Sequence, residues 1–159
     1  DLFTRDGLLT AQGSSTFWDR STLYAFRGAY AAGYADFITE HLAYYSNRRL
    51  LGDHVPYPIE AWPEGSQRHL SAESGLYCRI ITEGMFGIRP TGMRSFELKV
   101  EIPSEWEYAR LKHIRAFGGD FDIDAERTAK GKMLIKVSEQ GGKVQTFTVK
   151  PGTMINVKL

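Results

Sequence analysis

The residues of this chain with the clearest potential for chemistry lie in one proline-rich stretch, residues 53–69. Two carboxylates, Glu60 and Glu64, flank the aromatic Trp62. Paired carboxylates of this kind can act in general acid–base catalysis. Three prolines in residues 56–63 remove backbone donors and exclude a helix, so we expect a stiff loop. Stiff loops often carry binding or catalytic residues, although an ordinary exposed connection between helices has a similar composition.

The other polar and aromatic side chains of this stretch allow more than one interpretation. Trp62 and Tyr57 could present flat apolar faces to a ligand, or Trp62 could pack beneath the loop as its anchor. Arg68 could bind a carboxylate or form a surface salt bridge. His54 and His69 lack neighbouring Cys or further His residues, so we expect hydrogen-bonded loop residues and no metal site.

The segment before the loop predicts two helices joined by a turn. Residues 21–32 carry apolar residues at helical spacing, with Ser21 as a candidate cap. Residues 35–50 repeat the helical pattern. Gly33 is expected to end the first helix in the left-handed conformation. Two helices joined in this way form an antiparallel hairpin.

After the loop the pattern changes from helix to strand. Residues 72–85 predict a third helix, with Ser71 as its N-cap and Glu73 in its first turn. Beyond residue 90, alternating segments separated by turn residues predict five or six strands, at 95–102, 111–117, 121–125, 132–138, 143–149 and 154–159. The sequence therefore predicts an α+β chain, with a helical segment over residues 1–90 and an antiparallel β-sandwich over residues 91–159.

Two further groups are candidates for ligand contact. Trp18 and Asp19 precede the first helix and could lie beside the proline-rich loop, although Asp19 is also suited to cap that helix. In the β part, Asp120, Asp122 and Asp124 alternate on one strand and offer hard oxygen ligands for Ca²⁺. Because the rest of an EF-hand loop is missing, we expect them to form a solvated face.

Composition narrows the classes of partner. The chain has 159 residues, a net charge of +1 and one cysteine, Cys78, so we expect no nucleic-acid partner and no disulfide within the chain. No apolar run reaches the roughly 18–20 residues that span a bilayer, so we expect no membrane partner. The sequence starts at Asp1 without a signal peptide, which favours a piece of a longer protein.

Two motifs in this sequence suggest a family. The first is Gly52-Asp53-His54-Val55-Pro56-Tyr57-Pro58-Ile59-Glu60-Ala61, followed by Pro63-Glu64-Gly65 and His69-Leu70-Ser71-Ala72-Glu73-Ser74. The second is Ile81-Thr82-Glu83-Gly84-Met85-Phe86-Gly87-Ile88-Arg89-Pro90. Both resemble bacterial six-hairpin glycoside hydrolases, in which a barrel of paired helices, an (α/α)6 barrel, precedes a β-sandwich. The resemblance covers nearly the whole chain and implies the last hairpin, final loop, final helix and C-terminal sandwich of such an enzyme.

The resemblance implies hydrolysis of a glycosidic bond by two carboxyl groups, one activating water and the other protonating the leaving oxygen. Related inverting α-L-fucosidases carry the base before a Gly-Asn pair in the corresponding loop, and here Glu64 is followed by Gly65 and Ser66. Glu64 is therefore the expected base, and Glu60 is the alternative base or a ligand of a sugar hydroxyl. The partner acid is expected from the rest of the barrel.

The same resemblance implies a carbohydrate substrate, no cofactor and a periplasmic or secreted setting. The expected substrate-binding residues are Trp62, Tyr57, Arg68, His69 and Trp18. Three helices cannot close a barrel, so we expect apolar helix surface to pack on the remainder of the parent barrel or to self-associate, and the chain alone to be inactive.

Two other functions remain open from the sequence. The sandwich could bind carbohydrate without hydrolysing it, through the aromatic residues Trp106, Tyr108 and Phe117. It could also serve only to brace the barrel. An exposed pair of flat aromatic side chains on the sandwich would favour binding, and a cleft around Glu60, Trp62 and Glu64 would favour the enzyme.

Overall fold

A computed structural model describes residues 2–51, 57–63, 65 and 71–159 of the chain. The chain is α+β, as predicted, and forms two compact units, Asp1–Gly84 and Met85–Leu159. Within the described residues, every helix is too short or too polar to cross a lipid bilayer.

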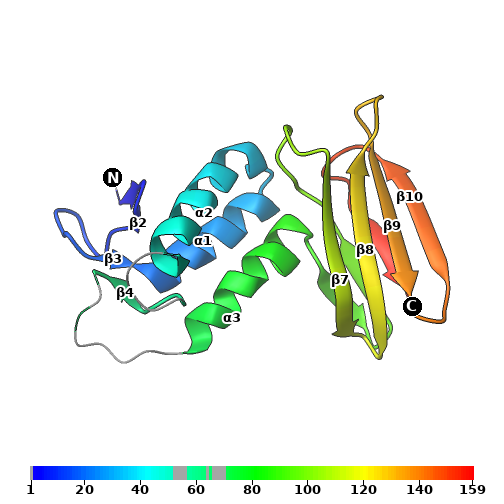
Figure 1. Ribbon diagram of the computed structural model, residues 1–159, viewed down its shortest axis with the longest axis horizontal. Coiled ribbons are helices and arrows are strands. Elements are labelled where there is room, and N and C mark those ends of the chain that lie inside the picture. The colour runs from blue at the N-terminus through cyan, green and yellow to red at the C-terminus, as the bar shows by residue number, and fades with distance from the viewer. Residues whose placement is uncertain (1, 52–56, 64, 66–70) are drawn as a thin grey trace. The chain divides into compact units, whose positions relative to one another are not determined.

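The first unit contains the helices and four short strands (Figure 1). Its elements are β1 (Phe3–Thr4), β2 (Gly7–Leu8), β3 (Phe17–Trp18), α1 (Asp19–Ala31), α2 (Ala35–Leu50), β4 (Ala61–Trp62), α3 (Ser71–Arg79) and the π-helical turn η1 (Ile80–Met85). The predicted bounds of the second helix are confirmed. The third predicted helix is divided, because its last six residues take the wider π-helical form. The two-residue strands were not predicted, since such short pairings carry no periodic pattern.

The start of α1 differs from the prediction. The N-cap is Trp18, and no side chain caps it by a hydrogen bond, so the capping roles predicted for Ser21 and Asp19 are wrong. Asp19 is instead the first residue of the helix and is fully buried. Burial of a carboxylate requires compensating partners.

Those partners come from the last two turns of α2. Arg49 Nε lies 3.1 Å from Asp19 Oδ2, and the hydroxyl of Tyr45 donates a hydrogen bond of 3.1 Å to the same oxygen. Arg49 also donates to the backbone carbonyl of Asp6 at 3.2 Å. Burial, and after it the charge of Asp19, raises the pKa of Tyr45 far above its usual range, so the phenol remains a donor.

Helices α1 and α3 run parallel, and α2 packs against both. Arg20 and Glu73 join the N-terminal ends of α1 and α3, and Arg27 in the second half of α1 pairs with Glu83 in η1, which continues α3. The ring of Tyr45 in α2 lies 5.7 Å from Phe26 of α1 and 6.5 Å from Tyr77 of α3. Gly84 permits a close approach, because a Cβ there would lie 3.3 Å from the backbone of Arg27.

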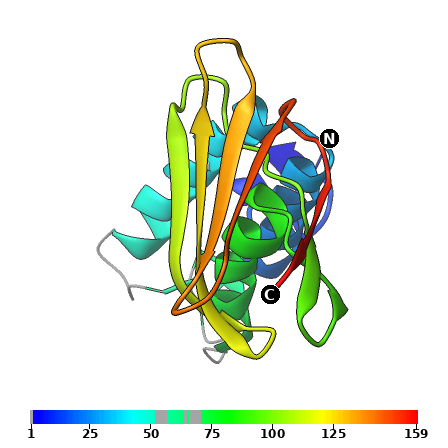
Figure 2. The ribbon, with the colours of Figure 1, turned by 90° about the vertical axis from the view of Figure 1, so that its right-hand side faces the viewer.

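The second unit consists of two antiparallel sheets. Their strands are β5 (Arg89–Gly92), β6 (Ser95–Leu98), β7 (Tyr108–Ala116), β8 (Gly119–Arg127), β9 (Met133–Glu139), β10 (Val144–Val149) and β11 (Ile155–Lys158). One sheet has the order β10-β9-β8-β7, which Figure 1 shows, and the other β11-β6-β5. The red C-terminal strand can be followed beside the green β6 segment in Figure 2.

Alternating side chains of the two sheets form the core of this unit. Phe121, Ile123 and Ala125 of β8 are fully buried, and the ring of Phe121 stacks 5.2 Å from that of Phe96 on β6. This contact packs the four-stranded sheet face to face with the three-stranded one. The period-two pattern predicted these inward positions because alternate residues of a strand share a face.

The three aspartates of β8 meet basic side chains of the neighbouring strand β7. Lys112 Nζ lies 3.2 Å from Asp122 and 2.9 Å from Asp124, and Arg115 Nε lies 3.4 Å from Asp120. A hydrogen bond from the backbone N–H of His113 lowers the pKa of Asp122. Cross-strand ion pairs of this kind stabilise a sheet face that is open to solvent.

Two adjacent arginines of α2, Arg49 buried and Arg48 partly exposed, provide a matched test of how much the buried ion pair contributes to the stability of the first unit. We predict that Arg49→Met lowers the free energy of unfolding by about 3 kcal/mol or more, because it leaves the carboxylate of Asp19 buried without its cation. Arg48→Met should cost about 1 kcal/mol or less, because the Arg48 side chain, which pairs with Asp6, is 39% exposed, against 1% for Arg49. Urea denaturation of both variants measures the difference, and equal losses would contradict it.

Candidate functional site

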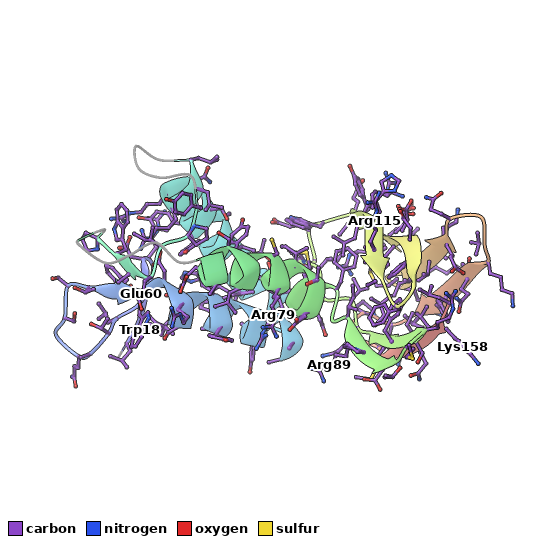
Figure 3. All side chains as sticks on the ribbon, turned by 90° about the horizontal axis from the view of Figure 1, so that it is seen from below. Trp18, Glu60, Arg79, Arg89, Arg115 and Lys158 are labelled. Atoms are coloured by element: carbon purple, nitrogen blue, oxygen red, sulfur yellow. The ribbon has the colours of Figure 1, made fainter. Side chains whose placement is uncertain are left out.

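A short strand pair brings the proline-rich loop beside the start of α1. Strand β3 pairs with β4, with Phe17 opposite Trp62 and Trp18 opposite Ala61. The backbone N–H of Asp19 donates a hydrogen bond of 3.0 Å to the carbonyl of Glu60. The predicted proximity of the Trp18 segment and the loop is therefore present in the structure, and Figure 3 shows Trp18 and Glu60 close together near the start of α1.

The carboxylate of Glu60 faces a guanidinium that is shared with a second carboxylate. Arg20 Nη2 lies 3.6 Å from Glu60 Oε1, and Arg20 Nε donates a hydrogen bond of 2.7 Å to Glu73 Oε1. The side chains of Glu60 and Arg20 are each about one-third exposed, whereas Glu73 is 0% exposed. The hydrogen bond with Glu73 raises the pKa of Arg20, so this guanidinium is a permanent cation at the site.

The two carboxylate oxygens of Glu73 differ in their partners within the described part of the chain. Among the described residues, Glu73 Oε2 is buried and has no hydrogen-bond partner. The sequence placed Glu73 in the first turn of the third helix, and it does lie there. Its pairing with Arg20 was not predicted, because the two residues are 53 positions apart in the chain.

The two tryptophans of the site differ in their surroundings. The ring of Trp62 is half-buried, and the guanidinium of Arg49 lies 4.2 Å from its centre, which is the anchoring geometry considered for this residue. Arg48 approaches the same ring to 5.5 Å. Trp18 is 41% exposed, so a large part of its ring can contact a ligand. Tyr57 is half-buried in the loop.

A hollow of about 380 Å³ lies between α1 and α3. Arg20 lines it and so connects it with Glu60. The other lining residues are Tyr24, Ala72, Gly75, Leu76 and Arg79. These residues were missed by sequence reasoning. The available signal was the succession of polar or small residues at helical spacing, at 20, 24 and 27 in one helix and at 72, 75 and 79 in the other.

Glu64, Arg68 and His69, together with His54, lie outside the described residues. Within the described part of the chain, no group of three or more His, Cys, Asp or Glu side chains could hold a metal ion. No protein-family model, curated protein or solved structure matches this chain.

The buried carboxylate of Glu73 gives a prediction for the site. Arg20→Leu should lower the free energy of unfolding by about 3 kcal/mol, because Glu73 would then be buried without a cation. The double variant Arg20→Leu/Glu73→Leu should recover most of this loss, since it removes both charges. Urea denaturation of the two single variants and the double variant completes the cycle. A double variant no more stable than Arg20→Leu would contradict the pairing.

Proposed function

We propose that this chain is the C-terminal part of a six-hairpin glycoside hydrolase that acts on oligo- or polysaccharide. The observation that carries the proposal is the position of Glu60, which lies beside Arg20 and near the exposed ring of Trp18. A carboxylate beside a guanidinium can hold a sugar hydroxyl while the aromatic ring contacts the apolar face of the sugar.

The arrangement of the three helices supports the same proposal. Helices α1 and α3 are parallel neighbours, and α2 packs antiparallel against both, as the paired helices of a barrel wall would. In an (α/α)6 barrel, α1 and α3 would be inner helices and α2 an outer one. Glu60 and Trp18 would then lie at the mouth of the barrel, since both are at the N-terminal end of α1.

Each candidate residue has a role in this proposal. Glu64 acts as the base that removes a proton from the attacking water, and a residue of the remaining barrel supplies the acid. Glu60 binds a sugar hydroxyl or takes the place of Glu64 as base. Trp18, Tyr57 and Trp62 contact sugar rings, Arg68 and His69 bind polar groups of the substrate, and the enzyme works in the periplasm or outside the cell.

Removal of each carboxylate tests the catalytic roles. In the polypeptide that carries this chain, Glu64→Gln should lower kcat by about 10²- to 10⁴-fold, because an amide cannot accept the proton of the attacking water. Glu60→Gln should mainly raise KM if Glu60 binds a hydroxyl. Release of reducing sugar from plant and host polysaccharides measures both.

The exposed Glu40 of α2 provides the control, and Glu40→Gln should retain activity. A large loss of kcat in Glu60→Gln alone would transfer the base role to Glu60. Full activity in both Glu64→Gln and Glu60→Gln would contradict the proposed function.

A carbohydrate-binding sandwich is the second candidate, because Trp106 and Tyr108 are both exposed. Two observations weaken it. Phe117, the third aromatic residue considered, stacks 4.8 Å from Phe96 and belongs to the core cluster. One face of Tyr108 lies under the guanidinium of Arg110, at 4.6 Å. Binding of sugar without any release of reducing sugar, lost in Trp106→Ala, would favour this function over hydrolysis.

Helix α2 and the two residues that flank it carry apolar side chains that would be covered in a barrel. Tyr34, Phe37 and Leu51 are all more than half exposed. We propose that the remainder of the parent barrel covers them, and that in the separate chain they pair with a second copy. Sedimentation velocity of the chain alone should show concentration-dependent association that Phe37→Lys weakens. A monomer at every concentration would argue against this covering.

A further inference from the structure

The hollow between α1 and α3 has the size and the lining of a small-ligand site. Its volume of about 380 Å³ lies in the range of roughly 300–1,000 Å³ that is usual for ligand pockets. Leu76, which is buried, and Tyr24, 45% exposed, both line it. The guanidinium of Arg27 lies over one face of the Tyr24 ring, at 5.1 Å, which leaves the other face for a ligand. An apolar floor, an aromatic wall and a guanidinium at one end match the apolar face and the hydroxyl edge of a sugar ring.

Charge balance around the hollow indicates the class of sugar. The guanidinium of Arg79 makes two hydrogen bonds with Glu83, of 2.5 and 2.9 Å, and Arg27 makes a third at 2.9 Å. The remaining arginine, Arg20, contacts Glu73 and Glu60. Each of the three arginines therefore already has a carboxylate partner. An acidic sugar would have to compete with these carboxylates, whereas an uncharged sugar needs only hydrogen bonds.

The position of Arg20 links the hollow to the proposed catalytic loop. Arg20 lines the hollow, and its Nη2 lies 3.6 Å from Oε1 of Glu60. An oligosaccharide with one sugar unit held near Glu60 can therefore extend along α1 and α3, so that the next sugar unit enters the hollow. Gly75 lines the hollow, and a Cβ added to it would meet no atom within 4 Å. A larger side chain at this position can enter the hollow without displacing neighbouring atoms.

We infer that this hollow, lined by Arg20, Tyr24 and Gly75, binds an uncharged sugar residue of the substrate adjacent to the residue held at Glu60. This assignment rests on the proposed function and specifies its substrate class as neutral oligosaccharide. Arg20 donates hydrogen bonds to hydroxyls of that sugar, and Tyr24 and Leu76 contact its apolar face. The site is separate from the roles assigned to Trp18, Tyr57 and Trp62.

Substitution of two glycines gives a matched test. Gly28 in α1 is also an exposed helical glycine with no atom within 4 Å of an added Cβ, but it does not line the hollow. The full polypeptide with Glu64→Gln, which prevents turnover, is titrated calorimetrically with gluco-, xylo-, manno- and galacto-configured hexasaccharides and with hexagalacturonate. Gly75→Leu should weaken neutral-sugar binding by about tenfold or more, and Gly28→Leu should change it by less than about twofold.

Tyr24→Ala provides a second variant, and thermal melting confirms that each variant is folded. Tyr24→Ala should lower the affinity for the same neutral sugars without changing which of them bind. Neutral-sugar affinity that is unchanged in both Gly75→Leu and Tyr24→Ala would overturn the assignment, and so would tighter binding of hexagalacturonate or no binding of any neutral sugar. Loss of hydrolysis in Glu64→Gln together with unaltered binding in both Gly75→Leu and Tyr24→Ala would refute the binding role of the hollow alone. Hydrolysis retained in Glu64→Gln and Glu60→Gln, with binding lost in Gly75→Leu, would refute only the proposed function.

Discussion

The first unit depends on one buried ion pair, between Asp19 at the start of α1 and Arg49 in the last turn of α2. Removing both charges from water is costly, so the pair is stable only because the remaining hydrogen-bonding groups are also satisfied. Tyr45 donates to Asp19, and Arg49 reaches the carbonyl of Asp6 and the ring of Trp62. A single guanidinium therefore joins the N-terminal hairpin, both helices of the antiparallel pair and the proline-rich loop. The described end of the loop, at Trp62, is held in this way by Arg49.

The contacts of Asp19 also place the loop beside the hollow between α1 and α3. Helix α2 packs on this pair through Tyr45, which contacts Phe26 of α1 and Tyr77 of α3, and the hollow lies between the same two helices. Strand β4 begins beside the N-terminal end of α1, where the carbonyl of Glu60 accepts a hydrogen bond from the N–H of Asp19. The same residue, Asp19, thus holds α2 with its side chain and the loop with its backbone. The carboxylate of Glu60 and the hollow are brought together by contacts that involve no ligand.

Sequence patterns predicted the elements of this chain better than the contacts between them. The bounds of α2 followed from helical spacing, and the inward residues of β8 followed from alternation, because each pattern is local. The pairing of Asp19 with Arg49 joins residues 30 positions apart, and neither spacing nor composition identifies which of the adjacent arginines is buried. For the same reason Asp19 was assigned to capping, and the hollow around Arg20 was missed. The segment before α1 was correctly expected beside the loop, since helix starts at one end of a bundle lie near each other.

The two buried carboxylates of the first unit, Asp19 and Glu73, differ in how many of their oxygens have partners among the described residues. Asp19 is paired with Arg49 and Tyr45, and a fully satisfied network of this kind rigidifies a core. Glu73 has Arg20 on one oxygen, but among the described residues its other oxygen has no hydrogen-bond partner. Native proteins pair the great majority of their buried polar atoms. Stability alone would favour an apolar residue over Glu73, because the buried pair costs desolvation. Its presence is explained if the role of Glu73 is to hold Arg20 between Glu60 and the hollow.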